Sequence, residues 1–170
     1  MGRRAYSTLA LLVLLAAGAC TSSDQELRAG GTVPAEWLAA GGAPAIPAGQ
    51  TTLVWVFRTD DCLSCQSFDY AVRRLQATYG DSLPFVAVHV GDAAREQVPR
   101  SFFRARRIQV ARSVTLSPPR FRRSYRETGL PALLVVRGST VAWSSALPAG
   151  VANAGQLDSL VQDVGRRVSE

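Results

Sequence analysis

The feature that most constrains the fold is a strand signal that runs directly into a helix signal near residue 62. Residues Thr51 to Arg58 (TTLVWVFR) are apolar and β-branched without helical periodicity, which indicates a buried strand. Thr59-Asp60-Asp61 are residue types that favour a helix N-cap. From Cys62 to Tyr79 the apolar residues recur at spacings of three and four, which predicts a helix that ends at Gly80-Asp81. Two cysteines, Cys62 and Cys65, therefore lie in the first turn of the predicted helix.

The remaining pattern predicts strands alternating with helices, followed by a hairpin and a last helix. In order, we expect a strand over Pro84–Val90, a helix around Arg100–Arg107, an extended segment within Ile108–Leu116, a helix from Pro119 to Thr128, a hairpin of Pro131–Arg137 and Thr140–Ser145, and a helix over Asn153–Val168. A β-α-β unit, an irregular helical crossover and an antiparallel pair together predict an α/β fold in three layers, with a mixed central sheet flanked by helices.

Composition places the chain among globular proteins of one domain with appendages. It has 170 residues, of which 47% are hydrophobic and 19% charged. All 19 basic residues are Arg, and ten of them fall between Arg95 and Arg126. Such a cluster can serve nucleic acid or anionic lipid, but we interpret it as a solvated helical region. Because an exported protein seldom meets nucleic acid, the leader described next also argues against that partner.

The N-terminus has the organisation of an export signal. Gly2-Arg3-Arg4 supplies a positive start, and Leu9 to Ala19 form an apolar run of 11 residues. As a helix this run spans about 16 Å, half of a hydrocarbon core, so we interpret residues 1–19 as a signal peptide and not as a membrane span. Ala17-Gly18-Ala19-Cys20 resembles a bacterial lipobox, which predicts that Cys20 is lipidated and becomes the mature N-terminus.

Residues 20–50 are expected to be the lipidated Cys and a flexible tether, leaving the folded domain to residues 51–168. The stretch is rich in Ala, Gly and Pro, and about thirty flexible residues span roughly 30 Å. Within it, Val33 to Ala40 could form a short helix or dock on the domain, with Trp37 and Leu38 as its anchors. Anchoring predicts a place in the bacterial cell envelope, facing the periplasm or the exterior. Thr21, after the lipobox, favours the outer membrane slightly.

The pair Cys62 and Cys65 admits three interpretations: a zinc site, a structural disulfide and a thiol catalyst. Zinc needs two more ligands, and beyond this pair the chain holds only Cys20 and His89 as Cys or His residues. His89 lies in a strand pattern and is better explained as a packed residue, so we expect no metal. A disulfide across two residues closes a tiny loop and stabilises little by chain entropy. Placement after a strand and at a helix start instead favours thiol chemistry.

A helix start is suited to an ionised thiol. Unpaired backbone N–H groups and the positive end of the helix dipole favour the thiolate of the first Cys. The second Cys lies one turn on, on the same face. We therefore predict that Cys62 is the attacking nucleophile and Cys65 the resolving thiol, so that the only redox group required is the Cys62–Cys65 disulfide, without a separate cofactor.

At these residues the chain resembles the thioredoxin superfamily, and more narrowly the membrane-anchored TlpA/ResA-type thiol–disulfide oxidoreductases. The resemblance covers about residues 50–168 and rests on the CxxC at a strand-to-helix junction and on Gly129-Leu130-Pro131 before a strand and hairpin. It implies that Pro131 follows a cis peptide bond beside the dithiol, and that Leu130 offers backbone hydrogen bonds to the substrate. It also implies that the partners are protein thiols or disulfides and a redox donor.

Several residues depart from the thioredoxin pattern. Asp61 stands where thioredoxins have Trp, and Leu63-Ser64 replaces Gly-Pro. Thioredoxins bury an acid six residues before the first Cys, where this chain has Val56, so a proton shuttle through that acid is absent. Asp60 and Asp61 oppose the helix dipole, each by about half a pKa unit in water-like dielectric. We expect a moderately lowered pKa for Cys62.

Three other functions stay open on sequence. A non-catalytic binding domain could keep the fold with a static disulfide. A peroxiredoxin would require a P-x-x-x-T/S-x-x-C pattern, which aligned on Cys65 places Arg58 at Pro and Cys62 at Thr. A copper-handling protein of the Sco type uses two Cys separated by three residues, whereas here the gap is two.

Overall fold

The computed structural model describes residues 27–38, 49–58, 62–92, 100–123, 125, 130–146 and 153–170; of residues 62–67, 100 and 146 only the backbone is described. The predicted signal peptide, Cys20 and the N-cap candidates at 59–61 lie outside these residues. Among the described helices, none combines the length and the apolar character that crossing a bilayer requires.

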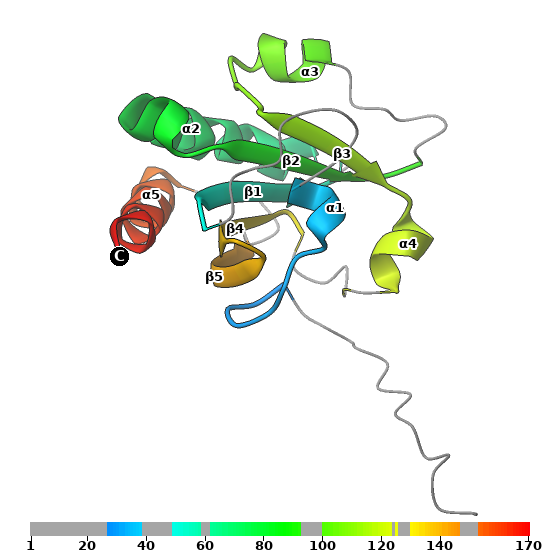
Figure 1. The fold of residues 1–170 in the computed structure, drawn as a ribbon. Coiled ribbons are helices and arrows are strands. Elements are labelled where there is room, and N and C mark those ends of the chain that lie inside the picture. The colour runs from blue at the N-terminus through cyan, green and yellow to red at the C-terminus, as the bar shows by residue number, and fades with distance from the viewer. Residues whose placement is uncertain are drawn as a thin grey trace, which may run out of the picture.

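The centre of the molecule is a five-stranded mixed sheet (Figure 1). Its strands are β1 (Thr51–Phe57), β2 (Phe85–Val90), β3 (Arg112–Leu116), β4 (Ala132–Arg137) and β5 (Thr140–Ala146), arranged in the order β3-β2-β1-β4-β5. β1 pairs in parallel with β2 and antiparallel with β4, and β3 joins β2 in parallel. β4 and β5 form the predicted hairpin, with a register shift between Val135 and Val136.

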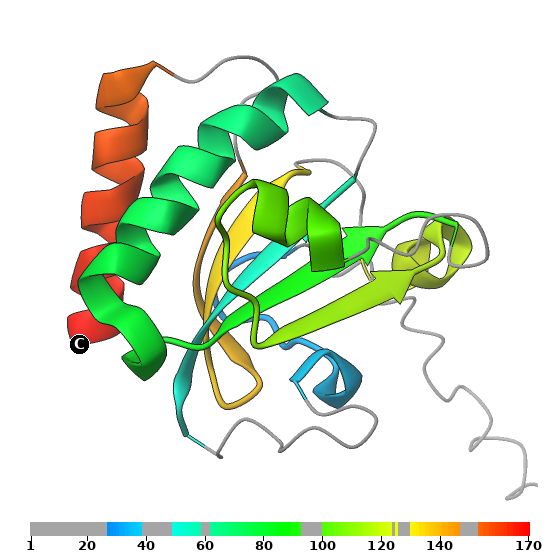
Figure 2. The same cartoon turned by 90° about the horizontal axis from the view of Figure 1, so that it is seen from above.

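Both faces of the sheet are covered, which explains why β1, β2 and β4 are continuous apolar runs. On one face, α2 (Cys62–Tyr79) and α5 (Ala154–Ser169) lie side by side (Figure 2), and α3 (Arg100–Ala105) adds Phe103 to the same core. On the other face, α1 (Ala35–Leu38) and α4 (Pro118–Arg122) bury Trp37 and Phe121. The predicted three-layer α/β architecture is confirmed.

The segment between β2 and β4 differs most from the sequence prediction. The extended segment expected within residues 108–116 is the edge strand β3, limited to Arg112–Leu116. The helix expected from Pro119 to Thr128 begins one residue earlier, at Pro118, and ends at Arg122. Residues 126–129 lie outside the described part. Two arginines of this region contact α1: Arg112 on β3 donates to the Leu38 carbonyl at 3.1 Å, and Arg120 on α4 pairs with Glu36 at 2.9 Å.

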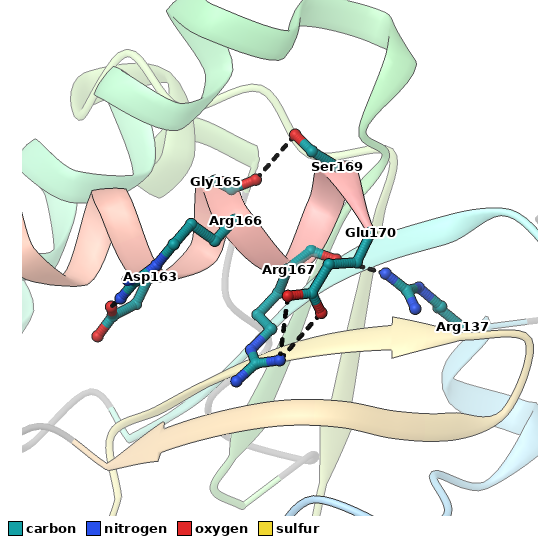
Figure 3. A network of polar contacts seen from close by, with 7 residues as sticks. All are labelled: Arg137, Asp163, Gly165, Arg166, Arg167, Ser169 and Glu170. Carbon is teal, nitrogen blue, oxygen red and sulfur yellow. Dashed lines mark hydrogen bonds and ion pairs between the residues drawn. The ribbon is translucent and has the colours of Figure 1, made fainter.

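The two long helices begin and end for local reasons. α2 ends at Tyr79, and the short 3₁₀ turn η1 (Gly80–Ser82) follows it. Gly80 has a φ of +53°, a conformation that favours glycine. α5 opens with a capping box in which Asn153 and Gln156 bond reciprocally. At its C-terminal end Arg137, the last residue of β4, donates to the Arg167 carbonyl at 2.6 Å, and Arg167 pairs with Glu170 at 2.9 Å (Figure 3). The end of α5 is thereby held to the sheet.

Residues 27–38 are part of the packed unit and not a free tether. Thr32 forms a β-bridge to Thr140, and Trp37 is fully buried against Phe121 and Tyr125, at ring-centroid distances of 6.4 and 5.3 Å. Burial, and secondarily Glu36, raises the pKa of Tyr125 to about 12, and its hydroxyl donates to the Thr32 carbonyl at 2.6 Å. Within this stretch Trp37 and Leu38 are buried on the domain, because the aromatic side chains of Phe121 on α4 and Tyr125 after it pack against the Trp37 indole.

Replacing Trp37 with Ala should therefore destabilise the whole domain. Removing a buried Trp side chain costs about 3–5 kcal/mol, so Trp37→Ala should lower the free energy of unfolding by that amount in urea denaturation. Glu36→Ala is the matched control, because it breaks only the exposed pair with Arg120 and should cost less than about 1 kcal/mol. Equal unfolding midpoints for Trp37→Ala and the parent protein would contradict the docking.

Candidate functional site

The backbone places the CxxC in the first turn of α2. The helix begins at Cys62, as predicted, and follows β1, the central strand of the sheet, after a short connection. Positions 62 and 65 are neighbours on one face of the helix, next to the backbone N–H groups that a first turn leaves unpaired. This is the local setting that stabilises a thiolate. The side chains of both cysteines lie outside the described atoms.

The peptide bond between Leu130 and Pro131 is cis, which confirms that part of the expectation. Pro131 is buried and Leu130 half-buried, and β4 begins at the next residue. The antiparallel register pairs Ala132 with Val56, one residue before the end of β1. Pro131 therefore lies at the end of the sheet from which α2 departs, as the start of β4 and the start of α2 in Figure 2 show. The substrate-binding role expected of Leu130 and Pro131 stays a prediction.

Val56 occupies the position at which thioredoxins have a buried acid. Val56 is fully buried and belongs to the apolar core on the α1 and α4 face of the sheet, whereas α2 covers the opposite face. His89 also behaves as a packed strand residue: it is fully buried in β2, with its ring 5.4 Å from that of Phe57. The side chains that the structure describes contain no group of three His, Cys, Asp or Glu residues fit to hold a metal ion.

A buried carboxylate on α2 was missed by the sequence analysis. Asp69 is 6% exposed, four residues after Cys65 and seven after Cys62. Its Oδ2 lies 3.2 Å from Nε of Arg106, just after α3, and the Arg106 guanidinium stacks over the Phe102 ring at 3.7 Å. Phe102 in turn stacks on Phe57, the last residue of β1, at 5.8 Å. The only sequence signal was an acid within the apolar pattern of α2, and nothing local pointed to Arg106 as its partner.

Burial controls the ionisation of this carboxylate. Loss of solvation raises the pKa of Asp69 from 3.8 to about 6, although the positive charges of Arg106 and Arg73 lower it. Its Oδ1 is also buried and accepts no hydrogen bond from the described residues. A buried carboxylate oxygen without a hydrogen bond lowers the stability of the folded protein when the group is ionised. The folded protein therefore favours the protonated form of Asp69 more than the unfolded chain does.

This shift predicts a pH dependence of stability. The folded state holds the Asp69 proton more tightly than the unfolded chain does. The contribution of Asp69 to the free energy of unfolding is therefore complete below about pH 4 and is lost as the pH rises through about 6. Two pKa units correspond to about 3 kcal/mol, so the stability of the parent protein relative to Asp69→Asn should fall by about 2–3 kcal/mol between pH 4 and pH 7. Urea denaturation at several pH values measures this difference. A difference that is constant with pH would contradict the assigned pKa.

Comparisons with known proteins identify the fold and no closer relationship. No protein-family model matches the chain, and no curated protein matches it in sequence. Among solved structures, the chain is similar to a thioredoxin-like protein in the oxidised form, with a TM-score of 0.55 and 18% identity over 85% of this chain and 98% of that one.

Two further structures have the same arrangement. A proposed thiol:disulfide interchange protein DsbE from Chlorobium tepidum has a TM-score of 0.51 and 15% identity, over 71% of this chain and 82% of its own. A proposed protein disulfide isomerase from Bacteroides thetaiotaomicron has a TM-score of 0.51 and 12% identity, over 72% of this chain and 76% of its own. The α/β architecture found above, a mixed five-stranded sheet flanked by helices, is thus a thioredoxin-like fold.

Proposed function

We propose that this chain is a thiol–disulfide oxidoreductase that exchanges disulfides with protein thiols through Cys62 and Cys65. The observation that carries the proposal is the position of the CxxC, in the first turn of α2 and at the end of the sheet where the cis Leu130–Pro131 bond precedes β4. The similarity in fold to proteins named for disulfide interchange and isomerisation supports it.

The reaction would proceed through a mixed disulfide. The Cys62 thiolate attacks a substrate disulfide, forms a bond to one substrate sulfur and releases the other as a thiolate. Cys65 then attacks Cys62, which breaks the mixed disulfide, releases the second substrate thiolate and leaves a Cys62–Cys65 disulfide. Two electrons have passed to the substrate, and a dithiol donor must return them to the protein. Oxidation of a substrate dithiol is the same sequence in reverse.

We also propose that lipid on Cys20 holds the domain at a bacterial membrane, on the periplasmic or outer side. The leader and the lipobox-like residues support this location. The docked segment adds a constraint: only residues 21–26 separate Cys20 from Leu27, the first residue described in contact with the core. Six extended residues reach about 20 Å, so the domain would stay closer to the headgroups than a tether to residue 50 allows.

A series of single Cys→Ser replacements tests the proposed activity. With dithiothreitol as electron source, the parent protein should accelerate insulin reduction, Cys62→Ser should abolish this activity, and Cys65→Ser should accumulate a mixed disulfide with the substrate. Cys20→Ser is the matched control and should keep full exchange activity, because it removes the third cysteine of the chain and leaves the pair intact.

The reduction potential separates a catalyst from a static disulfide. For the Cys20→Ser protein we expect a value above about −300 mV in glutathione or dithiothreitol redox buffers. A lower potential, together with no insulin reduction, would instead identify a binding domain with a structural disulfide.

A further inference from the structure

The turn that ends α3 carries an arginine in a left-handed backbone conformation. Arg107 has a φ of +57°, and among the described residues it is the only one besides glycines with a positive φ. Its N–H donates to the Arg104 carbonyl at 3.0 Å, and the N–H of Ile108 donates to the Phe103 carbonyl at 2.9 Å. These two bonds define a Schellman motif, in which the left-handed position is usually glycine. An arginine is less stable there than glycine, because its Cβ crowds the backbone.

The surroundings of this turn hold it in place beside α2 (Figure 2). Arg73 donates to the Arg106 carbonyl at 3.1 Å, and the N–H of Gln109 donates to Oε1 of Gln76 at 3.1 Å. Nε2 of Gln76 donates in return to the Gln109 carbonyl. The backbone is therefore bonded to α2 on both sides of Arg107, whose side chain is exposed. A strained residue that its surroundings hold in position is a candidate functional residue.

Arg107 lies where three surface hollows meet. Their volumes are about 720, 720 and 560 Å³, and Arg107 lines all three. The part of α2 that lines them runs from Tyr70 toward Gly80, about 15 Å at 1.5 Å per residue. Because they share Arg107, the hollows form one groove between residues 70–80 and residues 103–113, which we call the Arg107 groove.

The Arg107 groove is positively charged. Its described lining includes four exposed arginines and, among acids, Asp81 alone; the arginines are Arg73, Arg74, Arg104 and Arg107. Arg74 pairs with Asp158 on α5, whereas Arg104 and Arg107 form no side-chain hydrogen bond or ion pair with the residues that the structure describes. A guanidinium without a fixed partner can bind a carboxylate of a ligand through two parallel hydrogen bonds.

The shape and the location of the groove favour a polypeptide over a lipid surface. The groove is hollowed, and Ala77 and Val110 add apolar contacts between its cations. Leu27, the first residue described, packs on the opposite face of the sheet, with the core of α1 and α4. The chain that leads to Cys20 therefore meets the domain on the face away from the groove, and so would a membrane held by lipid on that cysteine.

We propose that the Arg107 groove binds an extended acidic segment of a partner protein. About 15 Å of groove accommodates about five extended residues, whose carboxylates pair with Arg104, Arg107 and Arg73. Position 62 lies eight residues before Tyr70, about 12 Å along the axis of α2, so about four further extended residues reach the start of the helix. The docking needs no thiol chemistry, whereas its use in presenting a partner's cysteine to the CxxC rests on the proposed function.

A labelled acidic peptide tests the docking. The probe is a fluorescein-labelled ten-residue peptide of alternating Glu and Ser, titrated with the Cys20→Ser protein in fluorescence anisotropy at low ionic strength. We expect saturable binding that weakens with added salt and is lost when Gln replaces Glu in the peptide. Arg104→Gln should weaken binding about fivefold. Arg123→Gln, an exposed arginine at the end of α4 on the opposite face, is the matched control and should change it less than about twofold.

The backbone of Arg107 allows a sharper test. Arg107→Gly should raise the urea midpoint of unfolding, because glycine tolerates a φ of +57°, and should at the same time weaken peptide binding about fivefold. Arg107→Lys keeps the Cβ and the charge, so the midpoint should stay unchanged and the affinity should stay within about threefold. If Arg107 only closes the turn, the glycine variant will be more stable and will bind the peptide as tightly as the parent protein.

The remaining outcomes decide the proposal. Absence of saturable binding, or equal affinities for the Arg104→Gln/Arg107→Gly double variant and Arg123→Gln, overturns the docking site. Vesicles of phosphatidylglycerol that bind the protein through Arg107 while the peptide does not would assign the groove to a membrane and overturn the protein partner. The probe contains no cysteine, so its failure to bind leaves the proposed function intact, and a failure of insulin reduction leaves the docking result intact.

Discussion

The structure depends on β1 being buried on both faces at the centre of the sheet. Its side chains alternate between two apolar cores, with Trp55 and Phe57 on the side of α2 and Val54 and Val56 on the side of α1 and α4. Because both faces of β1 are apolar, each face has to be covered by a helical layer before the strand is shielded from water. Because β1 also leads into α2, the same burial places the CxxC at one end of the sheet, across from the start of β4.

The two helical layers contribute different contacts around this strand. α1 and α4 close one face through the stacking of Trp37 on Phe121, and this contact brings residues that precede β1 by more than ten positions into the core. On the other face, α3 supplies Phe102, and Arg106 just after it pairs with Asp69 on α2. Arginines of the long connection between β2 and β4 therefore pair with specific partners on α1 and α2.

Much of the secondary structure followed from the sequence, because helices and hairpins are encoded by residues close together. The bounds of α2 matched the prediction at both ends, since Cys62 follows residue types that favour a helix start and Gly80 supplies a positive φ. The hairpin at Gly138-Ser139 and the last helix after Asn153 followed for the same reason. β3 was predicted only as an extended segment, because its strand identity depends on pairing with β2, which is separated from it by α3.

The sequence by itself determined the order of the elements and the position of the CxxC at a helix start, because both depend on local periodicity and on residues that begin or end a helix. The resemblance of Gly129-Leu130-Pro131 to a family motif added the cis bond that the structure contains. Only the tertiary structure decided that Phe121 and Tyr125 cover Trp37, and that Asp69 is buried with one oxygen that accepts no hydrogen bond from the described residues. Burial and the pKa shift it causes depend on which distant side chains cover a residue: Arg106 is 37 positions from Asp69 in the chain, and their contact forms only when the chain folds.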